Sequence, residues 1–197
     1  MEMVKRNRKG FTIIEAVLVL AIAGLIFMMV FIALPSLQRG QRNTQRRNDL
    51  AIIAAAMNTW RSKHGNVSVS DNYSKAFEAN GFCTFYNHYV DADMTDPSTG
   101  EAYRISLWNT TYVINCVTNK KINRRAYDSS AIGRSPNSNW AKMEVGDIQY
   151  DDVAMCDGEV FNDELGKSAG MHAFALRMYL EGGATICMDN GYSSSSK

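Results

Sequence analysis

A single carboxylate, Glu15, lies near the start of a stretch that otherwise could enter a membrane. The 19 residues from Ala16 to Leu34 carry no polar side chain, and a helix needs about 20 mostly apolar residues to cross the hydrocarbon core of a bilayer. An isolated charge at the bilayer centre costs on the order of 3 kcal/mol. Glu15 must therefore stay solvated at one face of the membrane, or meet a positive partner.

The residues before this stretch form a short basic leader, MEMVKRNRKG, that ends at Gly10. An ordinary secretory signal places its small-residue cleavage site after the apolar run, whereas here the small residue comes first. Cleavage after Gly10 would remove the basic leader and keep the apolar segment. The mature chain would then begin with a positively charged amine on Phe11.

The stretch K-G-F-T-I-I-E, followed by the apolar run, resembles the N-terminus of type IV prepilins and related pseudopilins, and the resemblance covers roughly residues 5–64. It implies cleavage between Gly10 and Phe11 by a membrane-embedded prepilin peptidase, N-methylation of Phe11, and assembly through the apolar helix. It also implies that Glu15 pairs with the Phe11 amine of a neighbouring subunit, so that two charges are buried together. A pair within one chain is geometrically open too, because Glu15 lies one helical turn from Phe11.

Two residues of the apolar segment are expected to weaken the helix. Proline removes a backbone hydrogen bond and bends or breaks a helix, and Pro35 lies about one turn later than the helix-kinking proline of many pilins. Gly24 costs roughly 1 kcal/mol relative to alanine. We expect a kink, and local unwinding in a filament, between Gly24 and Pro35.

Four cysteines lie beyond the apolar segment, without C-x-x-C spacing and without a histidine at ligand spacing. Zinc is therefore disfavoured, and an even count on the exported side of a membrane indicates two disulfides, for which sequence alone permits three connectivities. The pairing predicted from neighbouring positions and shared strand faces is Cys83–Cys116 and Cys156–Cys187. Each bridge would close a loop of about 30 residues and contribute roughly 3–4 kcal/mol on the chain-entropy model.

Residues 144–164 contain eight acidic residues and no Lys or Arg. Carboxylates at this density could bind Ca²⁺, with Asp147, Asp151 and Asp152 as the candidate ligands. Their spacing does not match an EF-hand loop, so a solvated acidic face is favoured, and docking onto an arginine-rich helix of a neighbouring subunit is a third reading. The chain lacks the common hydrolase, metalloprotease and nucleotide-binding motifs, and its three histidines are isolated. We expect neither an enzyme nor a cofactor.

A long helix from Phe11 to His64 is predicted to position these residues. In its second half Leu50, Ile53, Met57 and Trp60 recur at spacings of three and four, which is typical of an amphipathic helix. Between the two halves lies a basic stripe, for which a solvated or subunit-facing surface is favoured over nucleic-acid binding. Its members are Arg39, Arg42, Arg46 and Arg47.

The head is predicted to contain antiparallel β-hairpins. Side chains alternate in character over 103–107, 112–116 and 174–180 with the period of a β-strand, and 184–188 is expected to return as the partner strand of the last hairpin. Gly182-Gly183 is expected to form a two-residue hairpin loop. In that register Met178 lies opposite Cys187, which would place Cys187 on the face of the strand that carries Leu176.

The predicted fold class is α+β, with a long N-terminal helix packed against an antiparallel head, as in the type IV pilin fold. The expected organisation is a leader (1–10), a transmembrane or filament-core helix (11–34), its amphipathic continuation (35–64) and an extracellular head with a C-terminal disulfide region (65–197). By resemblance, the chain is a single-pass membrane precursor of an extracellular pilus for adhesion, twitching motility or DNA uptake. Implied partners are copies of itself, the peptidase, membrane lipid before assembly, and an inner-membrane assembly platform with cytoplasmic ATPases.

Two other functions are open. One is a pseudopilin of a type II secretion or competence system, which belongs to the same structural class. The other is a single-pass membrane-anchored extracellular binding module, whose anchor would need no Gly10-Phe11 junction.

Overall fold

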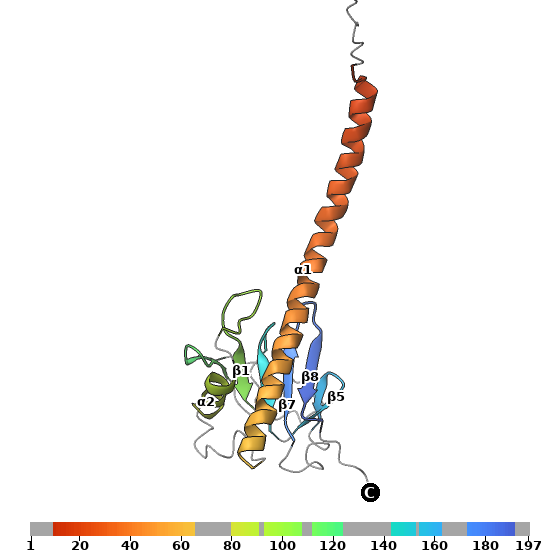
Figure 1. The fold of residues 1–197 in the computed structure, drawn as a ribbon. Coiled ribbons are helices and arrows are strands. Elements are labelled where there is room, and N and C mark those ends of the chain that lie inside the picture. Colours follow the sequence, from red (N-terminus) through yellow and green to blue (C-terminus); the bar gives the residue numbers. More distant parts are fainter. Residues whose placement is uncertain are drawn as a thin grey trace, which may run out of the picture. The chain divides into compact units, whose positions relative to one another are not determined.

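The computed structural model describes residues 10–65, 80–90, 93–107, 112–123, 143–152, 154–162 and 173–191. The chain divides into two compact units, Met1–Gln41 and Arg42–Lys197. The elements (Figure 1) are α1 (Ile13–Lys63), α2 (Asn80–Tyr89), β1 (Arg104–Leu107), β2 (Tyr112–Asn115), β3 (Lys120–Asn123), β4 (Ile148–Asp151), β5 (Met155–Asp157), β6 (Val160–Asn162), β7 (Ala175–Tyr179) and β8 (Thr185–Asp189). Residues 1–9 of the predicted leader lie outside the described residues.

The first unit consists of the N-terminal part of α1. Thr12 caps this helix, because its hydroxyl accepts a hydrogen bond from the backbone N–H of Glu15 at 3.4 Å. The helix continues through Gly24 and Pro35 without a break. Kinking or unwinding of this segment in a filament therefore stays a prediction.

The C-terminal part of α1 buries the predicted apolar stripe in the second unit. Leu50, Ile53, Met57 and Trp60 are all at most 2% exposed, and they contact apolar residues of the sheet in one core. The helix ends at Lys63, and Gly65 follows with a φ of 72°, the left-handed conformation that glycine adopts at helix ends.

Helix α2 was not predicted from the sequence. It buries Phe82, Phe85 and Tyr86 against α1 and the sheet, and the Phe85 ring packs edge-on against Trp60 with centroids 6.4 Å apart. The segment is rich in aromatic residues, which are common in strands. The spacing of its buried positions is nevertheless helical, and this signal was present in the sequence.

The head sheet has six strands in the order β3-β2-β1-β4-β7-β8, and β5 and β6 form a separate two-stranded sheet. All neighbours are antiparallel except β1 and β4, which are parallel. The parallel pair was not predicted, and it is possible because residues 108–147, which include β2 and β3, separate β1 from β4 in the chain, and parallel strands require such a long connection. The predicted α+β class, a long apolar N-terminal helix with an antiparallel-rich sheet, is confirmed.

The register of the last hairpin differs from the predicted one. Leu180 donates a backbone hydrogen bond to Ala184 at 2.8 Å, so the loop contains Glu181 as well as the two glycines. Cys187 consequently lies opposite Arg177, and Ile186 takes the place opposite Met178. A shift of one residue turns a side chain to the other face of a sheet, so the prediction that Cys187 shares a face with Leu176 was wrong.

Candidate functional site

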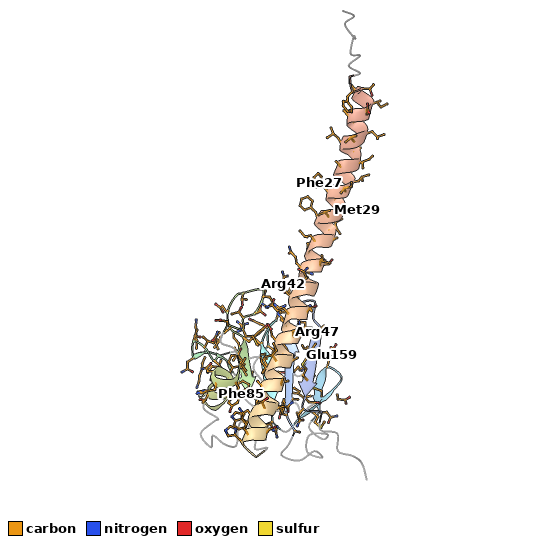
Figure 2. All side chains as sticks on the ribbon, in the orientation of Figure 1. Phe27, Met29, Arg42, Arg47, Phe85 and Glu159 are labelled. Carbon is orange, nitrogen blue, oxygen red and sulfur yellow. A yellow bond between two sulfur atoms is a disulfide. The ribbon has the colours of Figure 1, made fainter. Side chains whose placement is uncertain are left out.

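The first candidate site is the surface of α1 in the first unit. The large apolar side chains between Phe11 and Leu37 are 47% to 87% exposed, and those of Phe27 and Met29 stand away from the helix in Figure 2. An apolar surface this extensive is unusual on a soluble monomer and marks a membrane or protein contact. Within the described part of the chain, α1 is the one helix long and apolar enough to span a membrane.

The candidate processing residues lie at the start of this helix. Gly10 and Phe11 are exposed, and a Cβ atom added at Gly10 would have no heavy atom within 4 Å. Glu15 is exposed in the first turn of α1, where a carboxylate interacts favourably with the helix dipole. The roles of Gly10 and Phe11 in cleavage and of Glu15 in assembly stay predictions.

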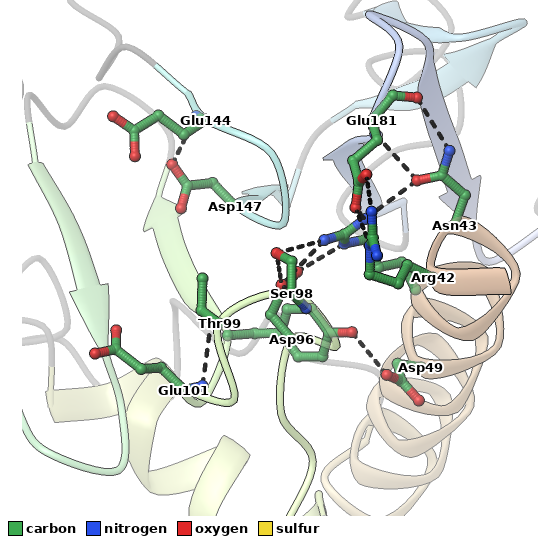
Figure 3. A network of polar contacts seen from close by, with 12 residues as sticks. Arg42, Asn43, Asp49, Asp96, Ser98, Thr99, Glu101, Glu144, Asp147 and Glu181 are labelled. Carbon is green, nitrogen blue, oxygen red and sulfur yellow. Dashed lines mark hydrogen bonds and ion pairs between the residues drawn. The ribbon is translucent and has the colours of Figure 1, made fainter. Parts of the chain in front are cut away.

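The second candidate site is a group of ion pairs that joins α1 to the head, which we call the arginine cluster (Arg42, Arg46, Asp96 and Glu181; Figure 3). Arg46 is at its centre, and its side chain is 0% exposed. Its guanidinium donates two hydrogen bonds to the Asp96 carboxylate, at 2.7 and 3.0 Å, and one to Glu181 at 2.8 Å. A buried charge is tolerated only with this degree of pairing.

The remaining contacts of the cluster hold the β7–β8 loop. Arg42 donates two hydrogen bonds of 2.7 Å to the two carboxylate oxygens of Glu181, a bidentate geometry that is among the strongest side-chain pairings. The side chain of Asn43 also exchanges two hydrogen bonds of 3.0 Å with the backbone of Glu181. Glu181, the loop residue that changes the hairpin register, is thus fixed on both its backbone and its side chain.

A tight turn places the other carboxylate of the cluster. Asp96 begins the turn over residues 96–100, where its backbone C=O accepts a hydrogen bond from Gly100 at 2.8 Å. Gly146 has a φ of 82°, and a Cβ atom there would collide with the Asp96 carboxylate. Glycine at 146 therefore serves both the backbone conformation and the close approach of Asp96.

Hydrogen bonds set the charge states of both carboxylates. The bonds from Arg42, against the opposing effect of burial and with the help of Arg46, lower the pKa of Glu181 from 4.5 to about 2. Burial raises the pKa of Asp96, but the hydrogen bonds from Arg46 and Ser98 outweigh it and lower that pKa. Both groups remain ionised at neutral pH.

The arginine cluster predicts an acid-sensitive contribution to stability. Because the Glu181 pKa is lower in the folded than in the unfolded chain, its contribution is complete above pH 4.5 and is lost as the pH falls to about 2. The difference in unfolding free energy between wild type and Glu181→Gln should therefore shrink across this window. Chemical denaturation of the full chain in detergent at pH 6, 4 and 2.5 measures it. Glu101→Gln, at an exposed position, is the control, and an equal loss for both variants at every pH would contradict the prediction.

The basic stripe was predicted to be a solvated or subunit-facing surface, and this is wrong for two of its four members. Arg42 and Arg46 bind carboxylates of their own head. Arg39 and Arg47 are exposed, and the described residues give neither of them an ion pair. Sequence reasoning missed the partners because they lie 50 and 135 residues from Arg46.

The structure contains the disulfides Cys83–Cys116 and Cys156–Cys187, the two pairs predicted from the sequence. The first lies in the main core, where it joins α2 to the residue that follows β2. The second joins β5 to β8 on the face of the sheet opposite α1, where Phe161 and Ala175 form a small apolar cluster. The two covalent links therefore secure opposite faces of the sheet.

The candidate calcium ligands are not brought together. Asp147 precedes β4 and Asp151 ends it, a separation of about 13 Å along a strand. Asp147 accepts a hydrogen bond from Arg104 at 2.7 Å, and the described residues contain no group of three or more metal-ligating side chains that could hold a metal ion. Asp163 and Glu164 of the acidic segment lie outside the described residues.

Comparison with known families supports the reading of the N-terminus. Residues 5–31 match the family model described as the prokaryotic N-terminal methylation motif. No curated protein and no solved structure matches the chain. The motif supports a type IV pilin-like precursor, and the long apolar helix that follows Gly10 is consistent with it.

Proposed function

We propose that the mature chain, beginning at Phe11, is the structural subunit of a type IV pilus that serves adhesion, twitching motility or DNA uptake. The observation that carries the proposal is the methylation motif at residues 5–31, continued by a helix whose large apolar side chains are exposed. Self-polymerisation would cover this surface, which membrane lipid covers before assembly. Cleavage by prepilin peptidase and an assembly platform with cytoplasmic ATPases complete the proposed pathway.

Within the filament, Glu15 has two separable properties. Its place in the first turn of α1, three residues after the capping Thr12, suits either a glutamate or a glutamine. Its charge matters only if it meets a cation, and the Phe11 amine of a neighbouring subunit is the proposed partner. Two such charges are costly to bury alone and tolerable together.

Glu15→Gln and Glu15→Val should both be cleaved and inserted into the membrane but should yield at least about tenfold fewer filaments, a loss equivalent to about 1.4 kcal/mol. Removing a charge favours the bilayer, whereas in the filament the Phe11 amine would be left unpaired. Glu15→Asp, which keeps the charge, is the matched control. The measurement is filament mass sheared from cells, with the membrane fraction blotted in parallel.

Wild-type filament yield from Glu15→Gln would show that the ion pair is dispensable and that Glu15 stays solvated at the interface. A defect in Glu15→Val alone would instead assign the residue a local role in capping the helix. Both results are distinguishable from a failure of cleavage, because the precursor is ten residues longer than the mature chain.

A further inference from the structure

Arg39 is the first charged residue after the apolar part of α1. No charged side chain lies between Glu15 and Arg39, and the side chains of Leu34 and Leu37, just before Arg39, are 47% and 64% exposed. Arg39 itself is exposed, and it makes no ion pair with a described residue. Its guanidinium can therefore bind an anion at the end of the apolar surface.

The length of the helix places Glu15 and Arg39 at the two faces of a bilayer at the same time. Arg39 follows Glu15 by 24 residues, which is about 36 Å at 1.5 Å per residue. The hydrocarbon core of a bilayer is about 30 Å thick, and the headgroups increase this to about 40–45 Å. When Glu15 lies among the headgroups on one side, Arg39 consequently lies among those on the other.

The arginines that follow are already engaged by carboxylates of the head. Arg42 binds Glu181, and Arg46 binds Asp96. Among the described residues of the first unit, 10–41, Arg39 is the one basic side chain. It is therefore the side chain that can supply positive charge at the level of the headgroups.

The apolar surface alone does not fix the depth of the helix. The segment from Phe11 to Leu37 has 27 residues, or about 40 Å of helix, which exceeds the core of about 30 Å. A segment longer than the core can tilt in the bilayer, so several positions would bury a similar apolar area. A guanidinium that is excluded from the hydrocarbon would select one of them.

We propose that, before assembly, the Arg39 guanidinium binds the phosphate of a phospholipid headgroup on the side of the membrane where the head lies, and so fixes the depth of α1. This inference rests on the proposed function, in which membrane lipid covers the apolar surface before assembly. A guanidinium donates two parallel hydrogen bonds to a phosphate. Its stem can follow the apolar surface while the charged end stays among the headgroups.

Native mass spectrometry of the full chain released from lipid nanodiscs tests the contact. From phosphatidylglycerol nanodiscs, wild type should retain lipid about fivefold more often than Arg39→Gln, the ratio expected for one basic residue at an anionic surface. Arg39→Lys, which keeps the charge, should retain lipid more often than Arg39→Gln. From nanodiscs of digalactosyldiacylglycerol, which has no phosphate, wild type and Arg39→Gln should retain lipid equally. The leader is the same in every variant, so the differences report position 39.

The depth of the helix is measured separately with a nitroxide at Ala33→Cys. The four native cysteines are paired in disulfides and do not take the label. Arg39→Leu should move the label toward the bilayer centre by up to about one helical turn, 5.4 Å. Gln38→Leu adds the same apolar side chain without removing the charge, so it is the matched control and should leave the label in place.

Equal retention of phosphatidylglycerol by wild type and Arg39→Gln would overturn the proposal. Retention of the galactolipid with the same dependence on Arg39 would also overturn it, since phosphate would not be the ligand. An unchanged label depth in Arg39→Leu would refute the role in fixing α1. Formation of both disulfides reports correct folding of each variant. These outcomes concern the chain in a membrane, whereas failure of the proposed function would appear as absence of filaments from wild-type cells.

Discussion

Replacing Gly10 with leucine is expected to leave the ten-residue leader attached and to abolish filaments while the protein stays in the membrane. The folded chain has room at this position, since a Cβ atom there would meet nothing within 4 Å. The loss would therefore come from exclusion of a large side chain by the peptidase rather than from misfolding. Intact mass of the membrane-extracted protein measures whether residues 1–10 remain.

Gly10→Ala, which adds one carbon, is the matched control and should be processed far better than Gly10→Leu. Normal filaments made from Gly10→Leu chains would refute cleavage at this junction. Filaments that retain the leader would refute the requirement for a free Phe11 amine, and the proposed pairing with Glu15 would then also be wrong.

Replacing Arg46 with methionine is expected to destabilise the head by about 3–5 kcal/mol, the usual cost of removing one partner from a buried ion pair. Arg46 is fully buried between two carboxylates, so its loss leaves Asp96 with an uncompensated charge. For a domain of this size that loss corresponds to a fall in Tm of about 6–20 °C. Thermal unfolding of the full chain in detergent, followed by circular dichroism, measures it.

The adjacent residue provides the control for this substitution. Arg47 is exposed, and the described residues give it no ion pair, so Arg47→Met should change stability by no more than about 0.5 kcal/mol. Equal effects of the two substitutions would mean that the arginine cluster contributes nothing beyond ordinary surface charge.

The long helix was predictable because its signals are local. The apolar run, the stripe from Leu50 to Trp60 and the glycine stop at Gly65 each depend on residues within a few turns of one another. The strands β1 and β7 were likewise readable from alternation, because one face of each packs on α1. Local periodicity was therefore enough to predict the fold class and to predict which half of α1 packs in the core.

The features that the sequence did not reveal depend on distant residues or on a shift of one position. Arg46 meets Asp96 and Glu181 only because the topology brings the 96–100 turn and the β7–β8 loop to the same part of α1. The position of Cys187 was mistaken because one residue more or less in a hairpin loop reverses every side chain of the following strand. Both errors concern Glu181, which lies in the β7–β8 loop and binds Arg42, Asn43 and Arg46 of α1.

Mass analysis of the N-terminus in filaments sheared from wild-type cells tests whether the chain is cleaved after Gly10 and then polymerises. We expect filaments built from this chain whose first residue is Phe11 carrying an N-methyl group. Filaments whose subunits begin at Met1, or cells whose full-length chain remains in the membrane without forming filaments, would contradict it.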